Sequence, residues 1–365
     1  MTKLPFRMKL FQSKSFIAML MIACLTGCAG IGPKTVSRDR FDYVTAISDS
    51  WKRQTLMNLL KTRYADAPVW MDVTSVINQY AVESQVQLAA SWANSPLTDT
   101  QSVGGSAKYT DRPTITYSPL TGEKFTKSLM TPIPVPGILS LMQSGYPADY
   151  IFRICVHTIN GIENSYGSAL TGRYADHDFI ELVNSLAKIQ RAGGLGMRVK
   201  QKDDDKTFVM FFRPPADPEV AAELHKVKDL LGLNREAKEF KVSYGSYSED
   251  DTEIAILSRS MLQVMIDFSS YVEVPESDVT EGRVYATHSS AGPGTGDDLP
   301  PMVKVRSGRN EPDESYVSVF YRDHWFWVED RDYRSKLVFN FLMYLFSMTE
   351  TGGQGTAPIV TVPTN

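Results

Sequence analysis

The sequence predicts an α+β protein, with an antiparallel sheet built from strand–strand–helix units, helices packed on one face, and a long helix preceding the sheet. Two observations lead to this class. Apolar residues recur at helical spacing over residues 40–63 and in several later segments. After residue 196, two short strand-like runs followed by a helix-like run occur three times. No fixed sequence repeat accompanies these units.

The first part of the chain, residues 39–195, is expected to mix helices and strands. Residues 40–63 predict one amphipathic helix that ends before Pro68. A strand is expected at 69–73, and residues 82–92 alternate apolar and polar types as a half-buried strand does. Residues 94–113, rich in Ser, Thr, Gly and Asp, predict a loop. Segments 114–117 and 125–129 flank a Ser-Pro-Leu-Thr-Gly turn and predict a hairpin.

Three helices are expected next. A short one covers residues 138–142 after a proline-rich entry, and a second starts at Pro147, a favoured first-turn residue. The third starts after Asp178, where Glu181 three positions on suggests a capping box, and Gly193 stops it.

The second part, residues 196–350, contains the three repeated units. The first combines a hairpin of 197–200 and 208–213 with a helix capped by Asp217. The second combines a hairpin of 240–244 and 253–257 with a helix over 261–268. The third combines a hairpin of 316–321 and 325–328 with a helix over 337–348. Residues 274–301 predict a flexible insertion, and 359–362 in the tail 351–365 could add an edge strand.

Residues 1–27 have the pattern of a secretory signal peptide, with Met1 or Met8 as the start. Four basic and no acidic residues precede an apolar run over 16–24, which is too short to span a bilayer permanently. Leu25, Thr26 and Gly27 followed by Cys28 resemble the lipobox of bacterial lipoproteins. That resemblance implies cleavage before Cys28, a diacylglycerol thioether on its sulfur and acylation of its amino group. Residues 28–38 would then be the lipid anchor and tether.

Three later segments are similar to parts of envelope lipoproteins of Gram-negative bacteria. They are residues 64–73, residues 326–336 and the ending at 357–363. The resemblance spans most of the mature chain, but it implies no activity and transfers no functional residue. Together with Ala29, where an aspartate would favour inner-membrane retention, it implies a periplasmic domain held at the outer membrane.

Charge and cysteine usage exclude several classes of function. Removal of residues 1–27 changes the formal net charge from −4 to −8, because four basic and no acidic residues are lost. An acidic chain is a poor candidate for binding nucleic acid or anionic headgroups. Beyond Cys24 and Cys28 only Cys155 remains, in an apolar run that predicts a buried, inert thiol. The five histidines lack zinc-ligand spacing, and neither a metal nor a cofactor is expected.

The densest candidate site is the segment 321–336. His324, Trp325 and Trp327 could form a partner surface together with Asp330 and Asp332. Alternatively, Glu329, Asp330 and Asp332 could bind or hydrolyse a cell-wall glycan. Helix capping by Asp330 or Asp332 and charge neutralisation by neighbouring arginines explain the acids more simply. The leading hypothesis is a structural or assembly subunit, more consistent with a non-enzyme, that binds another envelope protein.

Overall fold

A computed structural model describes residues 31–77, 80–91, 100–111, 114–167, 172–202, 205–213, 217–288 and 301–349. The predicted signal peptide, the lipobox with Cys28 and the tail 351–365 lie outside the described residues. The chain divides into two compact units, Met1–Lys52 and Arg53–Asn365. The described part of the first unit is the beginning of helix α2 (Ile31–Arg63), which starts earlier than the predicted residue 40. Everything below concerns the second unit.

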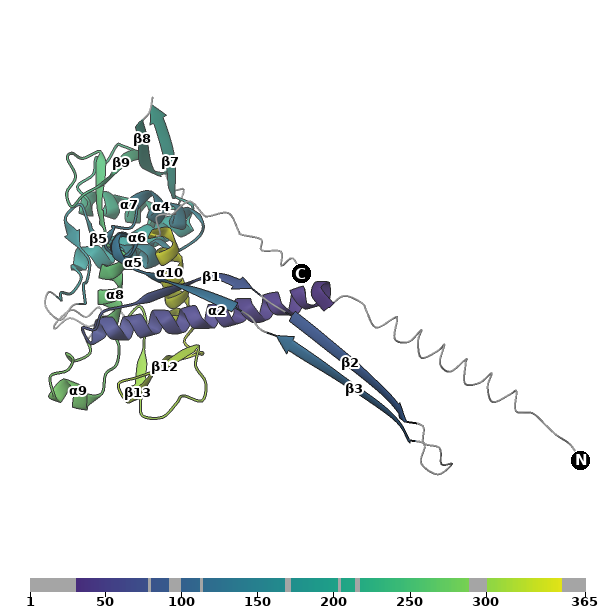
Figure 1. Cartoon of the computed structure of the whole chain (residues 1–365). Helices are drawn as coiled ribbons and strands as arrows, with labels where there is room; N and C mark the ends of the chain where they lie inside the picture. Colours follow the sequence, from purple (N-terminus) through teal and green to yellow (C-terminus); the bar gives the residue numbers. More distant parts are fainter. Residues whose placement is uncertain are drawn as a thin grey trace, which may run out of the picture. The chain divides into compact units, whose positions relative to one another are not determined.

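The end of α2 and the four strands after it open the second unit. Leu56, Leu59 and Leu60 of α2 are fully buried, as the helical spacing predicts. Strand β1 (Trp70–Ile77) pairs with β4 (Thr114–Leu120), and β2 (Tyr80–Ser91) pairs with β3 (Thr100–Asp111), all antiparallel. Figure 1 shows β2 and β3 side by side as long arrows.

Two predictions for this region are wrong. The expected loop at 94–113 contains β3, because its small and polar residues pair along a partner strand instead of remaining unpaired. The expected hairpin of 114–117 with 125–129 does not form. The first segment pairs with β1, and the second lies in helix α3 (Gly122–Met130). Its Phe125 and Leu129 are four residues apart, which is helical spacing, and both contribute to the core.

The helical predictions after residue 130 hold, with one correction. Helices α4 (Val135–Gln143), α5 (Ala148–Cys155) and α6 (His177–Arg191) lie where expected. The predicted capping box of Asp178 and Glu181 is wrong, because α6 starts two residues earlier. Its N-cap residue, Asp176, makes no side-chain cap bond. The Asp176 carboxylate instead accepts a hydrogen bond from the Glu163 amide at 2.8 Å.

The principal sheet has six strands in the order β6-β5-β10-β9-β8-β7. They are β5 (Val156–Ile159), β6 (Ile162–Glu163), β7 (Leu195–Lys202), β8 (Asp205–Phe212), β9 (Glu239–Tyr244) and β10 (Glu253–Ser258). The β7–β8 hairpin is confirmed, and Asp217 caps helix α7 (Pro218–Leu230) as predicted. The sheet contains strands from both sides of residue 195, so the predicted domain boundary falls within it.

The second predicted hairpin is wrong, although both of its strands exist. Strands β9 and β10 run parallel, so the sheet is mixed. The loop between them carries the chain back so that β10 can pair on its other side with β5. This central position fits the almost continuous burial of β10. Helix α8 (Met261–Ser270) follows, with a complete capping box between Ser260 and Gln263.

The third predicted unit forms a separate sheet. Strands β12 (Val317–Tyr321) and β13 (His324–Val328) make the expected hairpin, and β11 (Arg306–Gly308) pairs with β13 on its other side. Helix α10 (Tyr333–Thr349) follows. The expected flexible insertion at 274–301 contains helix α9 (Glu276–Thr280), and the Glu273 amide before it donates to Val305. Residues 289–300 lie outside the described part.

One continuous apolar core joins these elements. Fully buried phenylalanines come from the six-stranded sheet, the three-stranded sheet and four helices. They are Phe152, Phe179, Phe240, Phe268, Phe326, Phe339 and Phe341. The observed class is therefore α+β, as the sequence predicts.

Candidate functional site

The β12–β13 hairpin carries the aromatic residues predicted as a partner surface. Trp325 and Trp327 alternate with the fully buried Phe326, so both lie on the outer face of the strand, where they are half-buried. Trp325 packs against Phe320 with ring centroids 5.5 Å apart, and Phe320 is 52% exposed. His324 begins the strand, and its Nδ1 lies 3.2 Å from the Arg322 carbonyl oxygen. Phe320 and Trp325 therefore form a small aromatic patch on this hairpin, and its use as a partner surface stays a prediction.

The three carboxylates that follow are each bound to a different group. Glu329 lies 3.2 Å from Arg306, and Asp330 lies 2.8 Å from Lys336. Asp332 accepts hydrogen bonds from the Ser335 amide at 3.1 Å and the Ser335 hydroxyl at 2.7 Å, so it caps α10. These bonds lower the pKa of Asp332 although burial opposes them. The carboxylates therefore serve separate ion pairs and a helix cap, and the arrangement does not resemble a pair facing one cleavable bond.

The turn of the hairpin binds the end of α2, a contact that the sequence does not reveal. Arg322 lies in the left-handed region (φ 47°), and its Nη2 is 3.0 Å from the Asp66 carboxylate. The Tyr321 hydroxyl donates to the same carboxylate. Hydrogen bonds from Tyr321 and Arg322 lower the pKa of Asp66. The Arg322 guanidinium also covers the ring of Tyr64, whose hydroxyl donates to Asp278 at 2.7 Å.

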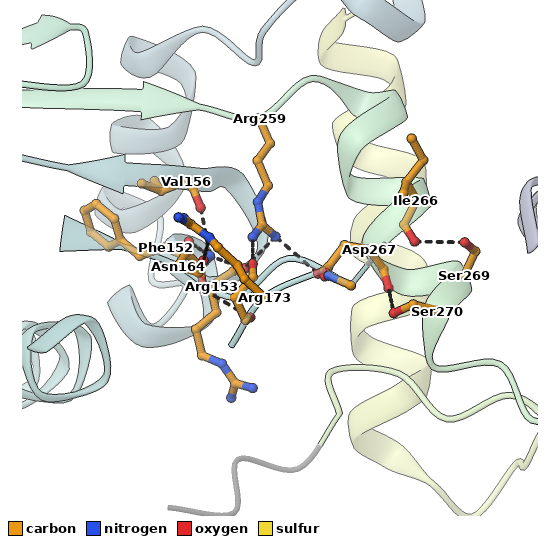
Figure 2. Close-up of polar contacts among 12 residues, drawn as sticks. Phe152, Arg153, Val156, Asn164, Arg173, Arg259, Ile266, Asp267, Ser269 and Ser270 are labelled. Carbon is orange, nitrogen blue, oxygen red and sulfur yellow. Dashed lines mark hydrogen bonds and ion pairs between the residues drawn. The ribbon is translucent and has the colours of Figure 1, made fainter. Parts of the chain in front are cut away.

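Figure 2 shows a buried polar network between the end of β10, helix α8 and the segment after β6. Arg259 is fully buried, and its Nη1 lies 3.2 Å from Oδ2 of the buried Asp267. Oδ1 of Asp267 accepts a hydrogen bond from the Gly167 amide at 2.5 Å. Arg259 also donates to the carbonyl oxygens of Arg153 and Ser165. Burial raises the pKa of Asp267, and the positive charge of Arg259 opposes that rise.

The network joins elements of the fold and offers no surface for a ligand. Asn164, also buried, donates to the carbonyl oxygens of Arg153 and Val156 at 2.9 and 2.8 Å and so closes the end of α5 (Figure 2). Arg259 faces the interior, and Ser260 serves the helix cap.

A hollow of about 850 Å³ lies beside strand β7. It is lined by apolar residues that include Met142, Leu195, Met197 and Phe211, and by Arg191 and Arg213. Arg198 covers the ring of Phe211 at 4.7 Å. The described lining contains one carboxylate, that of Asp149, and no histidine, cysteine or serine. None of the predicted site residues contributes to it.

The strands β1 to β4 form a second candidate surface. Ile77 faces Thr114 and Tyr80 faces Asp111, so the two ladders share one register. We call these four strands the ribbon. In its β1–β4 half, residues on both faces are exposed, with Ile77 (40%) on one face and Ile115 (40%) and Tyr117 (54%) on the other. A two-stranded ribbon exposed on both faces is marginally stable by itself, so this geometry favours a binding partner.

Among the described residues, side chains of α2 cover the edge at the beginning of the ribbon. Asn58 of α2 exchanges two hydrogen bonds with the backbone of Val69, both of 2.8 Å. Gln54 does the same with Met71 at 2.8 and 3.2 Å. These amides act as a neighbouring strand would. Their four-residue spacing on one helix face is the sequence signal that could have identified them. In the described part of β2 and β3, neither strand pairs with a third.

The comparisons with known proteins leave the family open. No protein-family model, characterised protein or solved structure matches the chain. The described residues contain no group of three or more His, Cys, Asp or Glu that could hold a metal ion. Among the helices that the structure describes, none combines the length and apolar character needed to cross a membrane.

Proposed function

We propose that the protein is a subunit of a bacterial envelope assembly, anchored by lipid at Cys28 and facing the periplasm, which joins a protein partner by strand pairing at the ribbon. The observation that carries this proposal is the continuous register of β2 with β3, with no third strand on either of them among the described residues. A free strand edge presents unpaired N–H and C=O groups, which is the surface that strand addition uses.

The membrane address in this proposal comes from the N-terminal sequence. Leu25, Thr26 and Gly27 before Cys28 match the lipobox pattern, and a charged segment and an apolar run precede them. Several acyl chains, each CH₂ contributing about 0.8 kcal/mol on burial, would hold the domain firmly at a membrane. The absence of an aspartate after Cys28 favours the outer membrane.

The structure favours assembly over glycan hydrolysis. Glu329, Asp330 and Asp332 are bound to Arg306, Lys336 and the start of α10, and none of them lines the hollow beside β7. The aromatic patch at Phe320 and Trp325 offers a smaller second contact surface.

The test is affinity isolation of the tagged full-length protein from crosslinked, detergent-solubilised envelopes. Radiolabelled palmitate should enter the wild-type protein, and Cys28→Ser should abolish both the label and membrane retention. We expect a protein recovered in stoichiometric amount from the wild type and lost when Leu88→Lys is introduced into β2. Trp325→Ala is the matched variant at the aromatic patch and should leave the complex intact. Absence of palmitate together with an empty eluate would refute the proposal.

A further inference from the structure

We propose that the partner at the free ribbon edges is a second copy of this chain, with β2 of one copy pairing antiparallel with β3 of the next. The inference rests on the proposed function, because it names the partner at the same surface. The outer edges of β2 and β3 are different surfaces, so the contact is heterologous and repeats from each copy to the next.

The backbone supplies the first argument. Each of β2 and β3 has 12 residues, and along an antiparallel strand alternate residues direct their N–H and C=O to one side. Each outer edge therefore exposes the groups of about six residues, and two facing edges can form about a dozen hydrogen bonds. Within a copy β2 and β3 are antiparallel, so a β3 edge next to a neighbouring β2 continues the same alternation of direction.

The order of residue types supplies the second argument. The register sets Val82 opposite Tyr109 and Leu88 opposite Val103, so apolar residues share one face of the ribbon. Gln85 opposite Ser106 and Ser91 opposite Thr100 belong to the other face. Residues of β2 and β3 that are opposite each other in the register are of similar polar or apolar character. If β2 of one copy pairs with β3 of the next in this same register, the apolar face and the polar face both continue across the boundary between copies.

The charges select this pairing over symmetric alternatives. The register places Glu83 opposite Lys108. At a level boundary between copies, Glu83 of one copy also takes the register position opposite Lys108 of the next, so acidic and basic residues alternate across the strands at this level. Pairing of β2 with a second β2 offers Glu83 no cation, because β2 contains no lysine or arginine. The sequence outside these positions adds only Asp111 to the charges of the two strands.

Ordinary protection against edge pairing is concentrated in the other half of the ribbon. There Asn58 and Gln54 cover the backbone of Val69 and Met71, the register shifts between Val73 and Ser75, and Pro119 interrupts β4. Prolines, bulges and covering side chains are the devices that keep edges from pairing. Strands β2 and β3 have no proline and one continuous register.

Disulfide trapping tests the pairing in the full-length protein in its membrane. Gln85→Cys and Ser106→Cys are made as separate single variants and co-expressed with different tags, so that a disulfide between them must join two chains. Cys155 gives little background, because it is fully buried and burial raises its pKa to about 12. We expect the mixed disulfide to exceed either like-with-like disulfide at least fivefold. A like-with-like product in excess would overturn the β2–β3 assignment.

Charge exchange tests the contact between copies separately from the contact within one. Glu83→Lys alone and Lys108→Glu alone each place like charges together, and each should reduce the oligomeric fraction at least fivefold. When the two variant proteins are mixed, every boundary between unlike copies regains opposite charges, although neither chain regains its internal pair. The mixture should recover at least half of the wild-type oligomer. Glu311→Lys, at an exposed glutamate, is the control and should change nothing.

The outcomes separate this inference from the proposed function. Oligomers with the expected disulfide but no palmitate on Cys28 would refute the lipid anchor and retain the inference. A different protein recovered through the ribbon, with no disulfide between copies, would refute the inference and retain the assembly role. A monomer that binds phosphatidylethanolamine–phosphatidylglycerol vesicles through Leu88 would mean that the apolar face meets lipid, and the inference would fail. No recovery from the charge mixture would also refute it.

Discussion

Removal of either member of the Arg259–Asp267 pair should destabilise the fold by about 3–5 kcal/mol, because the remaining charge stays buried without its partner. Arg259 is 0% exposed and Asp267 is 3% exposed, so neither group can reach water without local unfolding. Arg259→Met leaves the Asp267 carboxylate with the Gly167 amide as its hydrogen-bond donor within this network. Asp267→Leu leaves the guanidinium with the carbonyl oxygens of Arg153 and Ser165.

The double variant decides whether the pair acts as a unit. If the two effects were independent, their costs would add to about 6–10 kcal/mol. With both charges gone, the losses that remain are backbone hydrogen bonds worth about 1 kcal/mol each, so we expect a total of about 2–4 kcal/mol. The coupling energy, which is the additive sum minus this expected total, should therefore be about 4–6 kcal/mol in magnitude.

Urea unfolding of the purified wild type and three variants, followed by tryptophan fluorescence, measures this cycle. With a slope of about 3 kcal/mol per molar urea, each single variant should lower the midpoint by about 1–1.5 M. The urea midpoint of the double variant should be equal to or higher than the midpoints of the single variants. Additivity within about 0.5 kcal/mol would show that the two side chains are not coupled and would refute the reasoning.

Three further predictions concern other parts of the second unit. Asp332→Ala removes the cap of α10 and should lower the free energy of unfolding by about 1–2 kcal/mol, as measured by thermal unfolding. The control, Asp330→Ala, breaks an exposed ion pair and should lower it by less than about 1 kcal/mol. Equal losses in the two variants would argue against the cap. Cys155 should fail to react with a thiol reagent in the native protein and react once in urea, since burial raises its pKa to about 12. Hydrogen bonds lower the pKa of Asp66 below its ordinary 3.8, so its carboxylate stabilises the fold above pH 3.8, and this stabilisation is lost as the pH falls through the lowered pKa. Asp66→Asn should therefore make the free energy of unfolding less dependent on pH at the acid end. An unchanged pH dependence would contradict this.

Local signals in the sequence were sufficient where neighbours along the chain decide the structure. The helix cap at Asp217 and the β7–β8 and β12–β13 hairpins are local arrangements, and all three were predicted. The predicted Asp178–Glu181 capping box is wrong because α6 begins at His177, and the Asp176 carboxylate before it binds a distant group, the Glu163 amide. The parallel β9–β10 pair failed for a similar reason, since β10 also pairs with the distant β5.

The candidate site divides in the same way. The face shared by Trp325 and Trp327 follows from strand alternation, and Asp332 as a cap follows from its place before α10. The contact between Arg322 and Asp66 joins residues 256 positions apart, so no local pattern could reveal it. Likewise, the local sequence around Arg259 does not show that this residue is buried beside Asp267, because the tertiary fold brings the surrounding segments together.

By itself, the sequence determined the α+β class and the identity of most helices and strands, because burial periodicity and turn chemistry are properties of short segments. It also contains the lipobox pattern on which the proposed address depends. Only the tertiary structure decided which strands pair, which charges are buried and which edge remains open. Those outcomes depend on residues brought together from distant parts of the chain, where shared burial and backbone pairing outweigh local preference. The ribbon illustrates this, since β3 reads as a loop until β2 lies opposite it.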